Sequence, residues 1–376
     1  ILKKVTLKNA ILEKANLSEA NLSDANLNGA YLKYANLDNC TLELASLNGT
    51  ELLNARLNNA NLHRAELYRA NLSFAKLCEA DLSYGKLYHA QLRGADLSEA
   101  NLGFAQMMGA DLNRANLNNA RLQNCRLDGA DLRSANLENA NFSGAVLSRA
   151  NLAGADLCNT TLSNTRLVGA DLSCAKLTKA KLIGAILTGA RFMLAHLEEA
   201  DLTDAKLMRA HMSDANLSNC ILSNADLSRV YLSKANLSGA NLDRAELSGA
   251  NLLRASLSGA SLNGTYLNRA YLSSVGLINA NLSNADLRSA ELTGVNWDGA
   301  ILQGAKFGGD QGLSEEIKSQ LESQGARFTS NCYYPIDNEE VSRRRSIFKD
   351  NLKERMLDLE DILRKLQSNV DLLNNA

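Results

Sequence analysis

A large apolar residue stands at every fifth position of this chain, from Leu2 to Phe307, without an insertion. The interval gives (307 − 2)/5 + 1 = 62 such positions, and Met, Phe or Trp replaces Leu at six of them. Two residues before each one after Leu2 lies a small residue, which is Ala at 49 of the 61 positions from Val5 to Ala305. A fold for this chain has to place the same two residues in the same environment every five residues.

Neither an amphipathic helix nor a leucine-rich repeat fits this period. Five residues turn a helix by roughly 500°, so the Leu side chains would spread around all of its sides. Leucine-rich repeats need a period of about 20 to 29 residues. The small residue and the Leu are two apart, which is strand spacing, and the next two positions hold residues typical of turns. The pattern therefore predicts short extended steps joined by corners, stacked as coils.

The motif of a small residue, Asn or Asp, Leu or Phe and two variable residues resembles that of the pentapeptide-repeat proteins, as in ANLSEANLSDANLNGA at residues 15–30. The resemblance covers residues 1–308. It implies an all-β solenoid, a right-handed quadrilateral parallel β-helix with four pentapeptides per coil and the Leu and the small residue inside. On that basis 62 pentapeptides make about 15 coils, and the rod is roughly 75 Å long at ~4.8 Å per coil.

The segment after Phe307 predicts a helical cap over the last coil. Ser314 precedes two glutamates and reads as a helix start, whereas Gly325 reads as its stop. A solenoid needs such a cap over its apolar end, and we assign residues 309–329 to it. At the other end the sequence starts inside the repeat without a Met, so we expect missing residues or another chain to cover the first coil.

Residues 330–340 contain the only proline of the chain and predict a linker, and residues 341–376 predict an amphipathic helix. The apolar stripe of that helix is wider than a strict coiled-coil seam. It could pack back on the rod, pair with a second copy in a homodimer or bind a partner helix. The candidate helix interface consists of Leu352, Leu359, Ile362, Leu366 and Leu373.

Charge separates onto two opposite faces when every fourth pentapeptide is placed on the same side. The basic face comprises the outward residues around Leu7, Leu27 and onward to Phe307, and its balance is 12 − 5 = +7. The acidic face comprises those around Leu17, Leu37 and onward to Trp297, and its balance is 4 − 10 = −6. A chain with a formal net charge of −1 thus predicts a rod with two oppositely charged sides.

These charges either solvate a repetitive surface or mark a strip that binds a partner. Arg and Tyr are enriched at protein interfaces, so the faces other than the acidic one are the better candidates. The face that starts at Leu12 carries Tyr31, Tyr34, Phe74, Tyr231 and Tyr271. The candidate interaction face is the basic one, with Arg69, Lys86, Arg126, Arg166, Lys206, Arg209 and Arg229.

The sequence predicts no catalytic residues, no metal site and no cofactor. The four histidines fall on four different faces, and no phosphate-binding loop or CxxC pair is present. Cys40, Cys125 and Cys220 occupy the small inward position and are interpreted as packing residues. The acidic cluster at His196, Glu198, Glu199, Asp201 and Asp204 is either a solvated corner or a cation site.

The sequence therefore predicts a non-enzymatic scaffold or protein-interaction module, bacterial and cytoplasmic, that binds a protein partner through rod faces or its terminal helix. Nucleic acid is an improbable ligand for a chain of this net charge, and no apolar run reaches a membrane-spanning length. Some relatives in the resembled family mimic duplex DNA and bind type II topoisomerases such as gyrase. That role is the alternative, although ~75 Å of duplex carries on the order of 45 charges and the acidic face offers ten acids.

Overall fold

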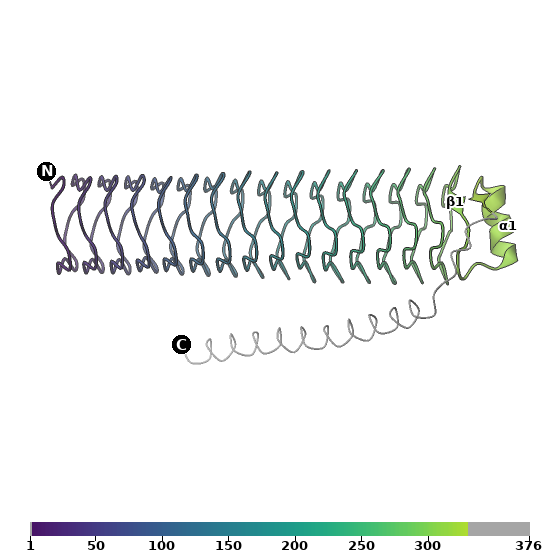
Figure 1. Cartoon of the computed structure of the whole chain (residues 1–376), viewed down its shortest axis with the longest axis horizontal. Coiled ribbons are helices and arrows are strands. Elements are labelled where there is room, and N and C mark those ends of the chain that lie inside the picture. The colour runs from purple at the N-terminus through teal and green to yellow at the C-terminus, as the bar shows by residue number, and fades with distance from the viewer. Residues whose placement is uncertain (1, 330–376) are drawn as a thin grey trace, which may run out of the picture. The chain divides into compact units, whose positions relative to one another are not determined.

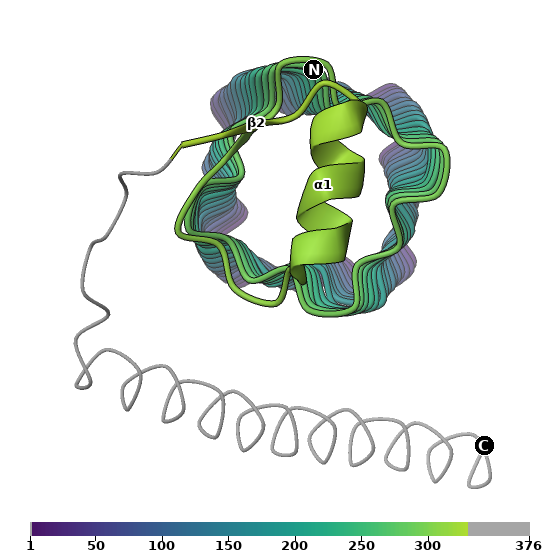
Figure 2. The ribbon, with the colours of Figure 1, turned by 90° about the vertical axis from the view of Figure 1, so that its right-hand side faces the viewer.

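The chain winds into a right-handed β-helix in which each coil takes twenty residues (Figure 1). The computed structural model describes residues 2–329. Parallel bridges join residues twenty apart, from Thr6↔Asn26 at one end to Glu291↔Gln311 at the other. Four pentapeptides therefore complete one coil, and the outline seen along the axis has four sides (Figure 2).

The backbone N–H groups of a pentapeptide are all satisfied, as the repeat around Leu137 illustrates. The N–H of Asn136 donates to a carbonyl of the preceding coil at 2.9 Å, and those of Leu137 and Asn139 donate to the following coil at 2.7 and 3.0 Å. The N–H of Ala140 closes a β-turn on the carbonyl of Leu137 at 3.0 Å. The N–H of Glu138 donates to Oδ1 of Asn136 at 3.2 Å. Asn or Asp before the Leu thus supplies the acceptor that the backbone lacks.

The turn in each repeat needs a left-handed residue. Its third residue has a positive φ along the rod, for example 59° at Asn139 and 64° at Gly169. Gly and Asn adopt this conformation at low cost, which explains their frequency at this position. Tyr84 and Phe104 adopt it as well, with φ of 59° at both.

The interior of the solenoid is a continuous column of the repeated large and small residues. The large residues from Leu22 to Phe307 are buried, as are the small residues between them, except at Val295, which is partly buried. Cys40, Cys125 and Cys220 are 0–1% exposed, so their assignment as packing residues is confirmed. Where Thr replaces Ala, its hydroxyl donates to a carbonyl of the preceding coil, as Thr160 does to Leu137 at 2.8 Å. A buried polar atom is thereby satisfied inside an apolar column.

The far end of the solenoid is closed by helix α1 (Glu315–Ser323), which lies across the last coil (Figure 2). The Ser314 hydroxyl accepts the N–H of Ile317 as an N-cap, at 3.3 Å. Leu321 of α1 is fully buried against the apolar column. These residues fall within the segment 309–329 that the sequence assigns to a cap.

Two short strands tie the cap to the rod. Strand β1 (Lys306–Phe307) pairs in parallel with strand β2 (Arg327–Phe328). The rings of Phe307 and Phe328 stack with centroids 5.0 Å apart, and Trp297 meets Phe307 edge-on at 6.0 Å. The aromatic residues that end the repeat therefore form the contact between the last coils and the cap.

The first coil is less covered than those that follow. Leu2 is 38% exposed, whereas Leu22 of the next coil is fully buried. The predicted linker 330–340 and terminal helix 341–376 lie outside the described residues, so both stay predictions. Within residues 2–329, no helix is long and apolar enough to cross a membrane.

Candidate functional site

Four residues of the candidate interaction face form one straight column along the rod. Successive bridges join residues 86, 106, 126, 146, 166, 186 and 206, so these side chains leave the sheet one above another. Cations stand on alternate coils of this column, with neutral residues between them. At a coil spacing of ~4.8 Å the cations recur about every 9.6 Å. The column reads Lys86, Gln106, Arg126, Val146, Arg166, Ile186 and Lys206.

The other three residues of the candidate face lie at its edge. Arg69, Arg209 and Arg229 occupy the third turn position, with φ between 53° and 58°. The aliphatic part of the Arg229 side chain lies against the following coil. Its Cγ is 3.6 Å from the position that a Cβ on Gly249 would occupy. All seven predicted residues are exposed, and the structure brings them onto a single side of the solenoid. Whether they bind a partner stays a prediction.

The cations at the N-terminal end of the column are already paired. Lys86 Nζ lies 2.9 Å from Glu66 Oε1, and Arg126 Nε lies 3.5 Å from Asp128 Oδ2. The hydrogen bond from Lys86 lowers the pKa of the Glu66 carboxyl below its usual value. Such exposed pairs contribute little to stability, but they reduce the charge that this end of the column offers to a partner.

The middle of the basic face carries no acid. We call the outward residues of 146–149, 166–169, 186–189 and 206–209 the acid-free stretch. Its cations form no ion pair with another described residue, and its apolar side chains stay partly exposed, with Met208 at 38%. Four unpaired cations and four apolar side chains therefore share one flat surface: Arg149, Arg166, Lys206, Arg209, Val146, Val168, Ile186 and Met208.

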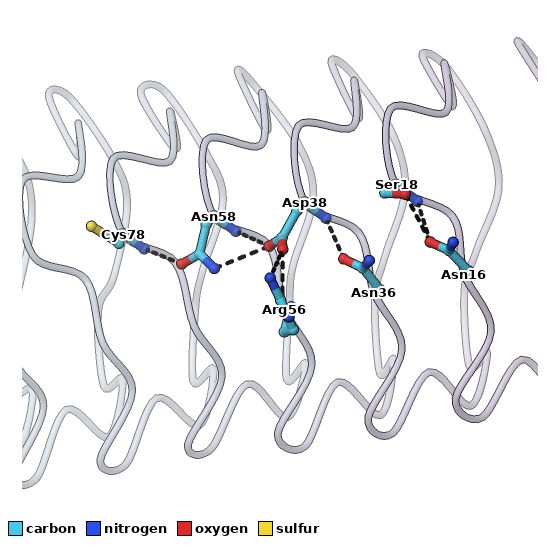
Figure 3. A network of polar contacts seen from close by, with 7 residues as sticks. All are labelled: Asn16, Ser18, Asn36, Asp38, Arg56, Asn58 and Cys78. Carbon is cyan, nitrogen blue, oxygen red and sulfur yellow. Dashed lines mark hydrogen bonds and ion pairs between the residues drawn. The ribbon is translucent and has the colours of Figure 1, made fainter.

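One carboxylate of the acidic face, that of Asp38, is held by partners within the protein (Figure 3). Arg56 takes the usual place of Asn, so it cannot accept the N–H of Asn58. Instead Oδ1 of Asp38, from the preceding coil, accepts that N–H at 2.9 Å and the Asn58 amide at 3.0 Å. The other oxygen, Oδ2, accepts from Arg56 Nε at 2.9 Å. Asp38 is consequently 8% exposed, and its charge is opposed by a guanidinium.

The acidic cluster is held by hydrogen bonds within the protein. Glu198 accepts from Asn216 at 2.6 Å and lies 3.1 Å from Nδ1 of His196. Burial acts to raise the pKa of the Glu198 carboxyl, but the backbone, His196 and Asn216 together lower it. Glu199 lies 3.7 Å from Lys179 Nζ, and Asp201 accepts from Thr203. No group of three or more His, Cys, Asp or Glu in the described part of the chain could hold a metal ion.

The assignment of charges to faces does not predict an aromatic cluster at the corner between the basic face and the neighbouring face around Leu62, Leu82 and Leu102. Three stacked segments form it, RAELYR (64–69), YGKLYH (84–89) and FAQMMG (104–109). The rings of Tyr84 and Phe104 stack at 4.8 Å with 6° between their planes. The signal in the sequence is that these aromatic residues recur at intervals of twenty, the length of one coil.

The second predicted interface cannot be placed. Leu352, Leu359, Ile362, Leu366 and Leu373 lie outside the described residues, so the helix interface stays a prediction.

The architecture defines a class, the right-handed β-helical repeat proteins built from pentapeptides. The family model described as pentapeptide repeats (8 copies) matches the chain in overlapping or adjoining stretches that run from residue 1 to residue 309. The chain therefore belongs to the pentapeptide-repeat family, as its sequence motif indicates. No curated protein matches the chain.

Solved structures of other pentapeptide-repeat proteins resemble the chain. HetL, involved in heterocyst differentiation regulation in the cyanobacterium Nostoc sp. strain PCC 7120, is 34% identical over 63% of this chain and 89% of its own, with a TM-score of 0.25. Alr5209 from the same organism is 31% identical over 33% and 84%, with a TM-score of 0.20. The plasmid-mediated fluoroquinolone resistance protein QnrB1 is 20% identical over 58% and 94%, with a TM-score of 0.24. At these TM-scores the likeness carries no argument about function.

Proposed function

We propose that this chain is a non-enzymatic protein-interaction module whose basic face binds a partner protein that presents carboxylates. The observation that carries the proposal is the acid-free stretch, where four cations without a carboxylate partner stand among partly exposed apolar side chains. Apolar contact surface with Arg is characteristic of protein interfaces. A complementary acidic surface would also be guided to this face by electrostatic attraction.

The rod geometry supports a scaffold rather than an enzyme. Its sides are built from short turns, and each interior position is filled by the repeat. A partner would contact several coils at once, because neighbouring rows lie only ~4.8 Å apart. Binding through the predicted terminal helix, including homodimer formation, stays a separate prediction. We place the protein in the bacterial cytoplasm on the sequence argument alone.

The test is a charge reversal on the basic face. The double variant Arg166→Glu/Lys206→Glu removes two unpaired cations of the column. The matched control Lys234→Glu/Arg254→Glu reverses two exposed cations on the face that starts at Leu12. Each chain is used to capture proteins from the source cells, with mass spectrometry to identify them. We expect the first variant to lose a partner that the control retains, and an identical set of captured proteins would contradict the proposal.

A further arm of the test separates the rod from the terminal helix. A chain that ends at residue 330 is compared with the intact chain in the same capture. A partner that both chains retain binds the rod, whereas a partner lost on shortening binds the helix and would leave the rod as a spacer.

The DNA-mimic alternative would use the acidic face. Several of its carboxylates are paired with cations of the same face, which reduces the likeness to a phosphate backbone. Asp38, Asp96, Asp156 and Glu199 pair with Arg56, Lys76, Lys176 and Lys179. A gyrase supercoiling assay distinguishes the two functions, since a DNA mimic would inhibit at micromolar concentration and a binder of acidic proteins would not.

A further inference from the structure

The stacked segments at 64–69, 84–89 and 104–109 place aromatic rings and cations together on three successive coils. We call their exposed or partly exposed tyrosine, phenylalanine and arginine side chains the aromatic patch. Tyr68, Tyr84 and Phe104 are 41%, 45% and 47% exposed, and together they form a contiguous exposed apolar surface. The patch comprises Arg64, Tyr68, Arg69, Tyr84, Tyr88 and Phe104.

The rings of the patch are not explained by the turn or by the core. Tyr84 and Phe104 hold a left-handed conformation, which costs a residue with a side chain about 1–2 kcal/mol relative to the right-handed region. Further along the same corner the turn residues are Asn124, Gly144 and Asn164, which tolerate this conformation. Residues with side chains take this conformation along the whole rod, Tyr34 and Phe74 among them. What distinguishes the patch is that its rings stack across successive coils and lie beside guanidinium groups.

Neighbouring groups lie over the rings of Tyr84, Phe104 and Tyr68. Phe104 stacks on one side of the Tyr84 ring, and the Arg64 guanidinium lies over that ring at 5.7 Å from its centroid. The Arg69 guanidinium lies 5.0 Å from the Tyr68 centroid. Single-stranded nucleic acid binds such surfaces by stacking its bases on free ring faces. Because the Tyr84 and Phe104 rings stack directly on each other at 4.8 Å, no base can enter between them, and the geometry favours apolar side chains over bases.

The charge of the patch selects for an acidic partner. Three cations on these segments, Arg64, Arg69 and Lys86, stand against one acid, Glu66, so the local balance is 3 − 1 = +2. Glu66 is already paired with Lys86. Neither Arg64 nor Arg69 forms an ion pair with another residue of the described rod, so both guanidinium groups can still receive carboxylates. Hydrogen bonds between guanidinium groups and carboxylates are among the stronger ones in proteins.

We propose that the aromatic patch binds an acidic peptide segment of a partner protein, with apolar side chains against the ring edges and carboxylates on Arg64 and Arg69. This inference rests on the proposed function in that both place a protein partner on the basic side of the rod. The patch is nevertheless a separate site, because it lies coils away from the acid-free stretch.

The test compares two double variants that differ only in the face they alter. Tyr84→Asn/Phe104→Asn removes the ring stack and leaves Asn, which the same corner already holds at residue 124. Tyr34→Asn/Phe74→Asn is the matched control. Tyr34 and Phe74 occupy the same turn position, with φ of 59° and 56° and exposures of 56% and 51%, on another face. Circular dichroism checks that both variants remain folded.

The probe is a random peptide library displayed on phage and selected on the intact chain, with Tyr84→Asn/Phe104→Asn as the counter-selection. We expect enriched peptides to carry Asp or Glu beside apolar residues. Measured by fluorescence anisotropy, such a peptide should bind the patch variant at least tenfold more weakly than the wild type, and the control variant equally well.

Three results would overturn the inference. One is the absence of any peptide enriched over the counter-selection. Another is that the enriched peptides lack acidic residues, or that the control variant binds the enriched peptide as weakly as the patch variant does. The third is a labelled oligothymidine that binds the wild type and loses binding only in the patch variant, which would assign the patch to single-stranded nucleic acid.

The proposed function and this inference can fail separately. The enriched peptide is expected to bind Arg166→Glu/Lys206→Glu as it binds the wild type, because those residues lie outside the patch. If that charge reversal leaves partner capture unchanged, the proposed function fails while the peptide still reports on the aromatic patch.

Discussion

Asp310 links the last coils to the cap, and its ionisation should weaken that junction. Its Oδ2 accepts the Gly308 N–H at 2.6 Å, and its Oδ1 accepts the Ala290 N–H at 3.3 Å. Burial raises the pKa of the Asp310 carboxyl from its ordinary value of 3.8 to about 6, against the effect of these hydrogen bonds, which lower it. The nearby Asp286 carboxylate also acts to raise it.

The raised pKa fixes the direction of the pH dependence. Between pH 3.8 and about 6 the folded protein keeps the Asp310 proton while the unfolded chain releases it, so the free energy of unfolding falls as the pH rises. The contribution of Asp310 is fully present below pH 3.8 and is lost above about 6. A difference of about 2 between the two pKa values corresponds to about 3 kcal/mol. Partial exposure of the group reduces this to about 2 kcal/mol.

The variant Asp310→Asn cannot ionise, so it should not show this loss. The assay is urea unfolding of wild type and variant from pH 4 to pH 7. Since Asn has one acceptor oxygen, we expect a constant difference of about 1 kcal/mol from a weakened hydrogen bond. In addition, the free energy of unfolding of the variant should rise by about 2 kcal/mol relative to that of the wild type as the pH rises. A difference between the two proteins that does not change with pH would refute the reasoning.

Two further predictions follow from the repeat. Asn136→Ala removes the acceptor of the Glu138 N–H and should lower the free energy of unfolding, measured in urea, by about 1–2 kcal/mol. Asn136→Asp keeps the acceptor and should lower it less. Equal losses in the two variants would contradict the role given to Oδ1 of Asn136. A maleimide should label the exposed Cys174 in the native protein but not Cys125, because Cys125 is buried and its burial raises the pKa of the thiol. Mass spectrometry follows the labelling, and similar rates at the two thiols would contradict a closed interior.

The interior of the rod was predictable because its rule is local. Each Leu and each small residue occupies a fixed place in a five-residue unit, so the sequence alone identifies Leu137 and Cys125 as inward residues. The number of repeats per coil came from the family resemblance, and the bridges between residues twenty apart agree with it. The sequence also predicted which charges share a face, because a rod without insertions keeps its register.

The pairings on each face were not predicted, because they depend on side-chain conformations across coils. The repeat predicts Asp38 as an outward acid, but Arg56 leaves the N–H of Asn58 without its usual acceptor, and Asp38 accepts it and is almost fully buried. Tyr84 stands where turn chemistry favours Gly or Asn, so a local rule would not place an aromatic stack there. Such features follow from the register of twenty residues rather than from the repeat of five.

The most direct measurement of the central claim is photo-crosslinking from matched positions on the two charged faces. A photoreactive amino acid replaces Thr188 on the basic face or Thr178 on the acidic face, two partly buried threonines at the same place in their pentapeptides. Both proteins are irradiated in source cells, and adducts are identified by mass spectrometry. The account predicts a partner adduct from residue 188 and none from residue 178. An adduct from residue 178 alone would contradict it.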